Sequence, residues 1–292
     1  MRAPLITLLL RLLALLPLPL AHAAGAGLGW LAWVIPNRAR RVTLTNLALC
    51  LPERDEDERR ALARRSLIET GKTVTEMGAM WFWPPRRVKT AVRGVRGKEV
   101  LQAGLNRGRG IILLTAHLGA WELVSLYLVQ ELALTCLYRP PRIEGLEATI
   151  LRSRERTGAR LVPTTPSGVK RLYQALARGE VVGILPDQDP GRGAGVFAPF
   201  FGVAANTMVL VPRLARATGA TVVFLYAERL PRGRGYAMRF REAPEGIDDA
   251  DPAVAAAAMN LGVEACVREC LAQYQWSYKR FKTRPQGEGK LY

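Results

Sequence analysis

Short apolar runs that alternate with amphipathic stretches constrain the fold of this chain more than any other feature. Four of these runs have the length of buried strands: Ile111–Thr115, Leu134–Tyr138, Val181–Leu185 and Thr221–Tyr226. The intervening stretches have the pattern of helices: 119–132, 143–157, 167–178 and 206–217. This alternation predicts an α/β fold with a central, mostly parallel sheet flanked by helices.

Further helices and a hairpin are expected before and after this region. Apolar residues at three- and four-residue spacing predict helix over 42–83. Pro231–Gly235 is typical of a hairpin turn, with a return strand at Tyr236–Arg241, and a last helix is expected over Pro252–Tyr274. The chain of 292 residues shows no clear linker, so we expect one globular domain over 42–292.

Residues 1–41 form an apolar segment that we expect to be a membrane anchor or an interfacial segment. As one helix, Leu12–Ile35 would be long enough to cross a hydrocarbon core of about 30 Å, and its only ionisable side chain is His22. The arginines that follow would then lie on the cytoplasmic side: Arg38, Arg40 and Arg41. Three alternatives stay open, because the segment can span the membrane, lie in its interface, or be cleaved as a signal peptide at Ala21–Ala23.

The charge balance predicts an anionic partner. The chain has 42 Lys and Arg against 25 Asp and Glu, a formal net charge of +17. Nucleic acid, anionic lipid and an acidic carrier protein would each satisfy such a charge. The apolar N-terminus favours a membrane, so we expect anionic membrane lipids as partners and no nucleic acid. A protein that only binds anionic lipid, without catalysis, is the alternative that charge alone would explain.

His117 is the one histidine beyond residue 42, which makes it the main candidate for acid–base chemistry near neutral pH. It follows a predicted strand, and Glu122 comes five residues later. The two side chains can meet if His117 lies in a loop and Glu122 in the first helical turn. A carboxylate that holds one imidazole nitrogen leaves the other free to accept a proton from a hydroxyl. On spacing alone, a histidine that caps a loop is the commoner interpretation.

Other catalytic chemistries lack their usual motifs. The sequence contains no G-x-S-x-G motif for a covalent nucleophile and no pair of histidines typical of catalytic zinc. We therefore expect direct transfer to a substrate hydroxyl, with no metal and no cofactor. Backbone N–H groups near Gly119, or an arginine, are the candidate donors to the oxyanion that such a transfer creates.

Five separated motifs occur in order along the chain: Glu76–Pro84, His117–Glu122, Tyr138–Pro140, Pro186–Asp189 and Gln275–Pro285. Together they resemble the bacterial lipid A biosynthesis late (lauroyl/myristoyl) acyltransferases, a branch of the acyltransferases that share an H-x4-D/E motif. The resemblance implies that 42–292 is an acyltransferase catalytic domain with a glycerophosphate-acyltransferase-like fold, behind a membrane-associated N-terminal helix.

The resemblance also implies roles for single residues. His117 would be the general base and Glu122 its orienting partner. The substrate-binding residues would be Arg139, Arg154 and Asp187. Arginines suit phosphate groups because their planar, charged forks bind oxygen atoms in pairs. From the residues alone, however, Arg152, Arg154 and Arg156 fit a solvated basic helix face, and Asp187 fits a turn.

The implied reaction moves a fatty acyl chain from acyl carrier protein to a hydroxyl of a phosphorylated lipid A precursor. It would take place at the bacterial inner membrane, with the catalytic domain on the cytoplasmic side, where acyl carrier protein is found. The same chemistry on another membrane lipid, such as an ornithine lipid, a glycerolipid or a mannoside, is the alternative.

Overall fold

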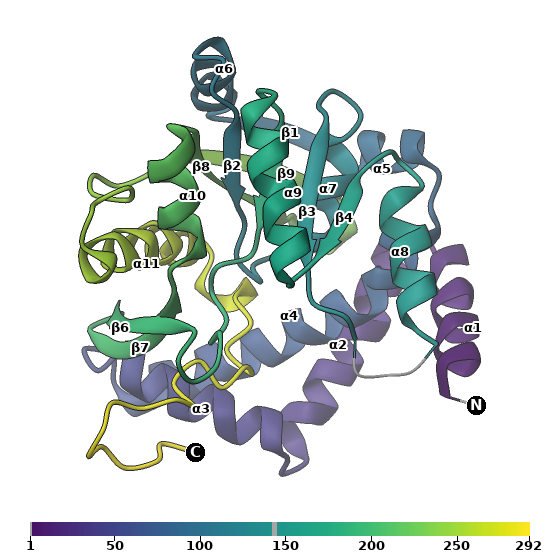
Figure 1. Cartoon of the computed structure of the whole chain (residues 1–292). Coiled ribbons are helices and arrows are strands. Elements are labelled where there is room, and N and C mark those ends of the chain that lie inside the picture. The colour runs from purple at the N-terminus through teal and green to yellow at the C-terminus, as the bar shows by residue number, and fades with distance from the viewer. Residues whose placement is uncertain (1, 142–144) are drawn as a thin grey trace.

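The computed structural model describes residues 2–141 and 145–292 and contains nine strands within them (Figure 1). The strands are β1 (Val92–Arg96), β2 (Ile111–Leu114), β3 (Leu134–Tyr138), β4 (Arg160–Pro163), β5 (Val181–Ile184), β6 (Gly195–Phe200), β7 (Val203–Met208), β8 (Thr221–Arg229) and β9 (Tyr236–Glu242). The helices are α1 (Arg2–Leu15), α2 (Leu18–Val34), α3 (Arg38–Cys50), α4 (Glu56–Phe82), α5 (Pro85–Ala91), α6 (Lys98–Asn106), α7 (Trp121–Leu128), α8 (Glu147–Glu155), α9 (Pro166–Ala177), α10 (Leu210–Thr218) and α11 (Pro252–Glu269).

Seven of the strands form one central sheet in the order β1-β9-β8-β2-β5-β3-β4. The five strands from β8 to β4 are parallel, while β9 runs antiparallel to β8 and β1 follows the direction of β9. β2 and β5 lie in the middle and are buried along their whole length. Their unbroken apolar runs suit strands covered by helices on both faces. The predicted α/β fold with a mostly parallel sheet is therefore confirmed.

The elements that the sequence did not predict are short or polar. The edge strands β1 and β4 are partly exposed and carry arginines, so they lack an apolar run. The β6–β7 hairpin stands apart from the main sheet, and β7 occupies the beginning of the helix expected over 206–217. The β8–β9 hairpin itself is confirmed, with a 3-10 turn at Pro231–Gly233.

The predicted helix over 42–83 is interrupted. α3 ends at Cys50, and α4 begins after Asp55, whose side chain accepts a hydrogen bond from the Glu58 amide and caps the new helix. Pro52 cannot continue α3, because proline has no N–H group for a helical hydrogen bond. The last helix is also shorter than expected, since α11 ends at Glu269 and only a 3-10 turn follows at Leu271–Gln273.

The stretch Leu12–Ile35 is not one continuous helix. α1 ends before Pro17, and α2 begins after it with Pro19 in its first turn, a position that proline favours. Within residues 2–141 and 145–292, no single helix is both long and apolar enough to cross a membrane. Taken together, α2 and α3 meet that test, but they are bent by 80°. The possible cleavage site at Ala21–Ala23 lies inside α2.

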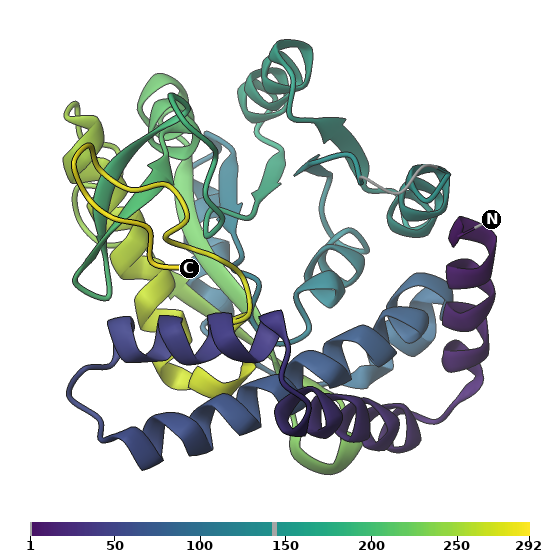
Figure 2. The same ribbon diagram turned by 90° about the horizontal axis from the view of Figure 1, so that it is seen from below.

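α2 packs along the long helix α4, and α1 packs across the carboxyl end of α4 (Figure 2). Glycine makes this contact close: a Cβ atom on Gly71 of α4 would lie 2.1 Å from the carbonyl oxygen of Gly25 in α2. The opposite faces of α1 and α2 leave large apolar side chains exposed, including Leu8, Leu12 and Trp30. The N-terminal segment is thus packed on one side and apolar on its free side.

A buried cluster of polar side chains ties these helices to the sheet. The Glu76 carboxylate on α4 accepts hydrogen bonds from Arg229 of β8, from the Tyr236 hydroxyl at 2.9 Å and from His22 of α2 at 2.9 Å. Arg229 also donates to Glu69 at 2.7 Å. Burial alone would raise the pKa of Glu76, but the charge and hydrogen bonds of Arg229, with those of His22, lower it to about 2. Glu76 is therefore ionised near neutral pH.

Glu76→Gln is expected to lower the free energy of unfolding by about 3 kcal/mol at neutral pH, because the buried Arg229 charge then loses the more deeply buried of its two carboxylate partners, Glu76 and Glu69. The folded pKa of about 2 lies below the ordinary value of 4.5, so this stabilisation is present above pH 4.5 and is lost as the pH falls towards 2. Urea unfolding of detergent-solubilised protein across this pH range measures it.

Glu131→Gln is the matched control, because the Glu131 side chain is 43% exposed and pairs with the surface residues Lys89 and Lys98. We expect it to change the free energy of unfolding by less than about 0.5 kcal/mol. Equal losses in the two variants would contradict the role given to the buried cluster.

Candidate active site

The candidate site lies at the carboxyl edge of the two central strands. β2 and β5 are paired in register, Leu114 with Ile184, and the Thr115 amide extends the pairing by donating to the Ile184 carbonyl at 3.2 Å. His117 follows β2, and Asp187 follows β5. The fold therefore brings these two side chains to one point, at the edge of a parallel sheet where ligands usually bind.

His117 and Asp187 are joined by two hydrogen bonds. The ring Nδ1 lies 2.9 Å from one carboxylate oxygen of Asp187, and the His117 amide donates to the other at 3.0 Å. Asp187 is buried, and burial alone would raise its pKa. The charge of His117 and the hydrogen bonds from its ring and its amide outweigh burial, so the pKa of Asp187 is lower than its ordinary value.

This pairing sets the tautomer of the imidazole. An ionised carboxylate only accepts hydrogen bonds, so Nδ1 carries the proton and Nε2 keeps its lone pair. The side-chain amide nitrogen of Gln188 lies 3.3 Å from Nε2. The His117 side chain is 15% exposed, and its ring lies beside Trp121 with 5.0 Å between the ring centres. In the neutral imidazole, Nε2 is thus the nitrogen whose lone pair is not directed at Asp187.

The expected contact between His117 and Glu122 is wrong. Among the described residues, the Glu122 carboxylate instead accepts hydrogen bonds from Arg154 of α8, one of them 2.9 Å long from Nε. The loop after His117 is fixed by backbone bonds: the His117 carbonyl accepts from the Gln275 amide at 3.0 Å, and Gly119 donates to the Gln273 carbonyl at 3.1 Å. Asp187 lies 70 residues from His117 in the chain, so spacing within the motif could not reveal it.

Two of the candidate backbone donors near Gly119 already have partners in the fold. The amide of Gly119 is engaged by Gln273, and the amide of Ala120 donates to the Ala227 carbonyl at 2.9 Å. A residue with a side chain would not fit at this position, because a Cβ atom on Gly119 would lie 2.1 Å from that Ala227 oxygen. Both amides dock the loop, one on the 3-10 turn Leu271–Gln273 and the other on β8, and are not free to bind an oxyanion.

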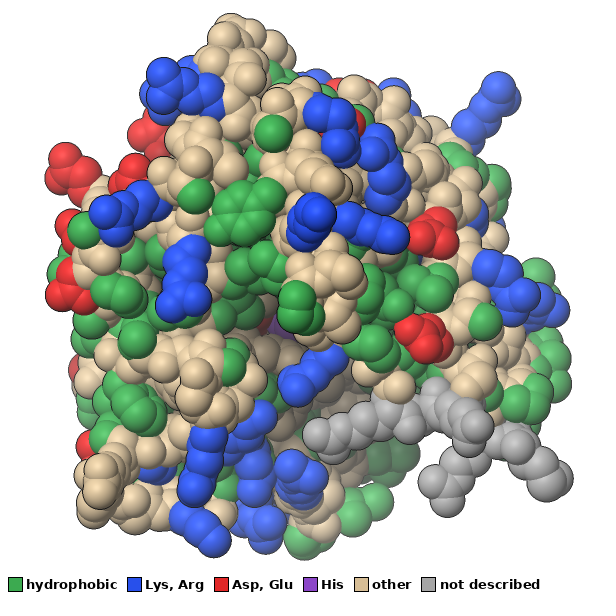
Figure 3. Space-filling model, in the orientation of Figure 1, with side chains coloured by type: hydrophobic (Ala, Val, Ile, Leu, Met, Phe, Trp, Pro, Cys, Tyr) green, Lys and Arg blue, Asp and Glu red, His purple; other side chains and the backbone are tan. Residues whose placement is uncertain are grey.

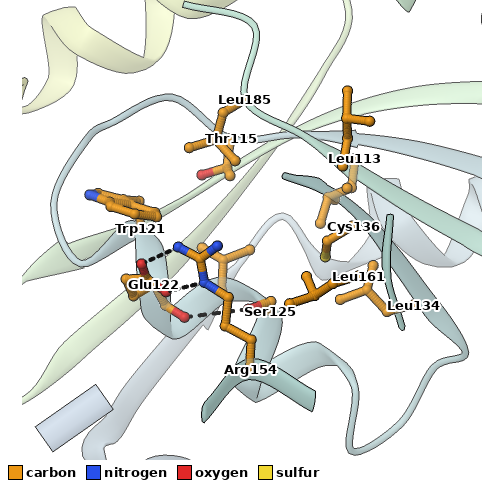
Figure 4. A pocket seen from close by; sticks show the side chains of 13 residues that line it. Leu113, Thr115, Trp121, Glu122, Ser125, Leu134, Cys136, Arg154, Leu161 and Leu185 are labelled. Atoms are coloured by element: carbon orange, nitrogen blue, oxygen red, sulfur yellow. Dashed lines mark hydrogen bonds and ion pairs between the residues drawn. The ribbon is translucent and has the colours of Figure 1, made fainter. Parts of the chain in front are cut away.

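Trp121 lies beside the ion pair of Glu122 and Arg154 (Figure 4), and its ring also contacts the imidazole of His117. The Arg154 guanidinium lies 5.7 Å from the centre of one face of the Trp121 ring system. Burial works to lower the pKa of Arg154, but the charge and hydrogen bonds of Glu122 outweigh it and raise that pKa. A permanently charged arginine is therefore held close to His117.

The three arginines around α8 do not share a solvated face: Arg152, Arg154 and Arg156. Only Arg152 fits that interpretation, because it is exposed. Arg156 donates to three carbonyl groups at the end of α4, those of Met80, Trp81 and Trp83. Carbonyls at a helix end lack helical partners, so Arg156 caps α4 and docks α8 on it. Arg139 follows β3 at the same sheet edge as His117 and is exposed.

An apolar pocket opens next to this constellation and runs along the sheet (Figure 4). Thr115, Trp121 and Leu185 line it near the sheet edge, and Leu113 and Leu134 line it farther in. Figure 3 shows a histidine in a hollow on this side of the molecule, with Lys and Arg side chains gathered below it. In the part of the chain that is described, no group of three or more His, Cys, Asp or Glu side chains is arranged to hold a metal ion.

The sequence matches a known protein family over most of its length. Residues 3–283 match the family model described as bacterial lipid A biosynthesis acyltransferase. The chain is 35% identical to the lipid A biosynthesis lauroyltransferase of Escherichia coli K12, over 95% of this chain and 90% of that protein. It is 31% identical to the palmitoleoyltransferase of the same strain, with the same coverage. A lipid A biosynthesis acyltransferase of Haemophilus influenzae is 29% identical over 92% of this chain and 86% of its own length. The chain belongs to the bacterial lipid A biosynthesis acyltransferase family.

Proposed function

We propose that this protein transfers a fatty acyl chain from the thioester of acyl carrier protein to a hydroxyl of a phosphorylated lipid A precursor. The observation that carries the proposal is the imidazole of His117, held through Nδ1 by the buried Asp187 and flanked by Trp121, a residue that also lines an apolar pocket. This arrangement supplies a base for a hydroxyl and a space for an acyl chain.

In the proposed reaction, His117 Nε2 takes the proton of the acceptor hydroxyl while the hydroxyl oxygen attacks the thioester carbonyl carbon. A carbon–oxygen bond forms, and the carbonyl oxygen becomes an oxyanion. The oxyanion collapses, the carbon–sulfur bond breaks, and the imidazolium gives its proton to the departing sulfur. Asp187 stays ionised throughout and stabilises the imidazolium, as its lowered pKa supports.

Arg154 and Arg139 are proposed to bind oxygen atoms of the substrates. The Glu122 carboxylate fixes the position of the Arg154 side chain, so Glu122 acts as a positioning residue for Arg154 and not for His117. Arg139 is exposed at the carboxyl end of β3, where it can reach a phosphate group in solvent.

We also propose that residues 1–41 attach the catalytic domain, 42–292, to the cytoplasmic side of the inner membrane. The exposed leucines of α1 and α2 would contact the acyl region of the bilayer. Arg38, Arg40 and Arg41 line an open hollow of about 500 Å³ at the beginning of α3, where they would meet anionic headgroups. His22 of α2 is buried against Glu76 of α4, which supports the proposal that residues 1–41 are kept and not cleaved off.

Replacing two exposed leucines of α1 should weaken membrane attachment. Leu8 and Leu12 are 55% and 54% exposed, and burial of a leucine side chain in an apolar phase is favourable by about 1.5–3 kcal/mol. We expect Leu8→Ser with Leu12→Ser to lower partitioning into phosphatidylglycerol-containing vesicles by about tenfold or more. Leu261→Ser is the control, because this residue is 56% exposed on the distant helix α11. A similar loss of vesicle partitioning in the α1 variant and in the α11 control would contradict the proposal that α1 faces the membrane.

The direct test of function is an acyl-transfer assay with the purified full chain. Lauroyl thioesters of acyl carrier protein are offered with a lipid A precursor that has a free 3-hydroxyacyl group, and mass spectrometry measures the product. We expect the acceptor to gain one acyl chain. Parallel reactions with an ornithine lipid, a lysoglycerolipid and a mannoside identify the acceptor class. Transfer to one of these instead would overturn the acceptor, and no transfer at all would favour a protein that only binds lipid.

A further inference from the structure

A glycine lies in the most buried part of the sheet, beside the candidate site. Gly183 is the third residue of β5, where it pairs with Leu113 of β2 on one side and Cys136 of β3 on the other. Glycine weakens the interior of a strand, and in such a position it often marks a place where another group approaches closely. Gly183 lines the apolar pocket, so the group that needs this space can be a ligand.

The pocket is built by one face of three neighbouring strands. Side chains two residues apart point to the same face of a strand, and this face carries the pairs Leu113 with Thr115, Leu134 with Cys136, and Gly183 with Leu185. Val124 of α7 lines the pocket from its opposite side. Without a side chain at Gly183, the middle of this face is lower than its surroundings, which makes a channel along the sheet.

The two ends of the channel differ in polarity. Thr115, Glu122 and Arg154 lie at the end near His117, and Leu113 and Leu134 lie at the far end. Leu134 is opposite Val181, four residues before Leu185 on β5. The channel therefore has a length of about 13 Å, at about 3.3 Å for each strand residue. An extended hydrocarbon of about ten carbon atoms covers that distance, since each carbon–carbon bond is about 1.5 Å long.

We infer that this channel receives the acyl tail of the donor and that Gly183 and Cys136 determine the chain length that fits. The inference rests on the proposed function. The thioester lies beside His117 at the polar end, and the methyl end lies against Leu134. Burial raises the pKa of Cys136 to about 12, so its thiol is neutral and suits an apolar wall.

Gly183→Ala tests this assignment. The added Cβ atom would lie 3.1 Å from the Cys136 sulfur and 3.7 Å from a methyl group of Leu134, so a small shift of flexible side chains accommodates it and the protein should fold. The methyl group occupies the channel itself. With octanoyl, decanoyl, lauroyl and myristoyl thioesters of acyl carrier protein, we expect kcat/KM for the longest chain accepted by the wild type to fall by about tenfold or more. For the octanoyl thioester, kcat/KM should stay at the wild-type value.

Two further variants make the test specific. Gly104→Ala adds a methyl group of similar fit, 3.3 Å from Ile111, on a helix away from the channel, and should leave the chain-length profile unchanged. Cys136→Ala enlarges the channel and should shift the profile towards longer chains. An unchanged profile in Gly183→Ala and Cys136→Ala, with normal transfer, would overturn the inference alone. Absence of transfer by the wild type with every thioester would instead overturn the proposed function.

Discussion

His117→Ala is expected to lower kcat/KM for acyl transfer by about 10²–10⁴-fold, the usual contribution of a positioned general base. The substituted chain still has the apolar pocket and the ion pair of Glu122 and Arg154, so substrate binding should largely persist. The loss should therefore appear mainly in kcat. Steady-state kinetics with the lauroyl thioester and the lipid A precursor measures both parameters, and thermal unfolding of the same samples shows that the variant is folded.

The second histidine of the chain provides the control for this prediction. His22 is 5% exposed and lies in the Glu76 cluster between α2 and the sheet, away from the substrate pocket. His22→Gln should lower stability and leave kcat of the folded protein within a few-fold of the wild type. Added imidazole should restore part of the activity of His117→Ala and should leave the activity of His22→Gln unchanged. Full activity in His117→Ala would remove the base from the mechanism.

The core of the sheet could be predicted from the sequence because its strands are buried on both faces. β2 and β5 appear as unbroken apolar runs, and such a run needs no knowledge of its neighbours. β1 and β4 gave no such signal, since edge strands keep polar side chains in solvent. The break between α1 and α2 follows from Pro17, but its position also depends on how both helices pack on α4.

The candidate site was predictable only where it is local in the chain. His117 stands out as a histidine after a buried strand, and that placement is confirmed by the structure. Its partner depends on the register of β2 and β5, which brings Asp187 to the same edge from 70 residues away. The partner of Glu122 depends in the same way on where α8 docks, which Arg156 fixes through the carbonyls of α4. Tertiary contacts, and not spacing, select both carboxylate partners.

Asp187→Asn is expected to reduce kcat by about 10³-fold or more, because it reverses the tautomer of the base. The asparagine oxygen can still accept from the His117 amide, so the loop keeps its shape, but its NH₂ group would face Nδ1. Nδ1 must then accept, and the proton moves to Nε2, where no lone pair is left for the substrate. Because the pKa of Asp187 is lower than usual, the wild-type carboxylate stays ionised over the whole neutral range. A lower pH cannot restore a lone pair at Nε2 in the variant, so acid should not rescue it.

Glu122→Gln is the matched comparison, since it makes the same chemical change in the other carboxylate of the site. Here the loss is one charged partner of Arg154, for which we expect about a tenfold effect that appears mainly in KM. The two substitutions thus differ in the size of their effect and in the kinetic constant that changes: a large fall in kcat for Asp187→Asn and a small rise in KM for Glu122→Gln. The reverse ranking would mean that Glu122 orients His117 during catalysis, and that the pairing of Asp187 with the imidazole serves the fold alone.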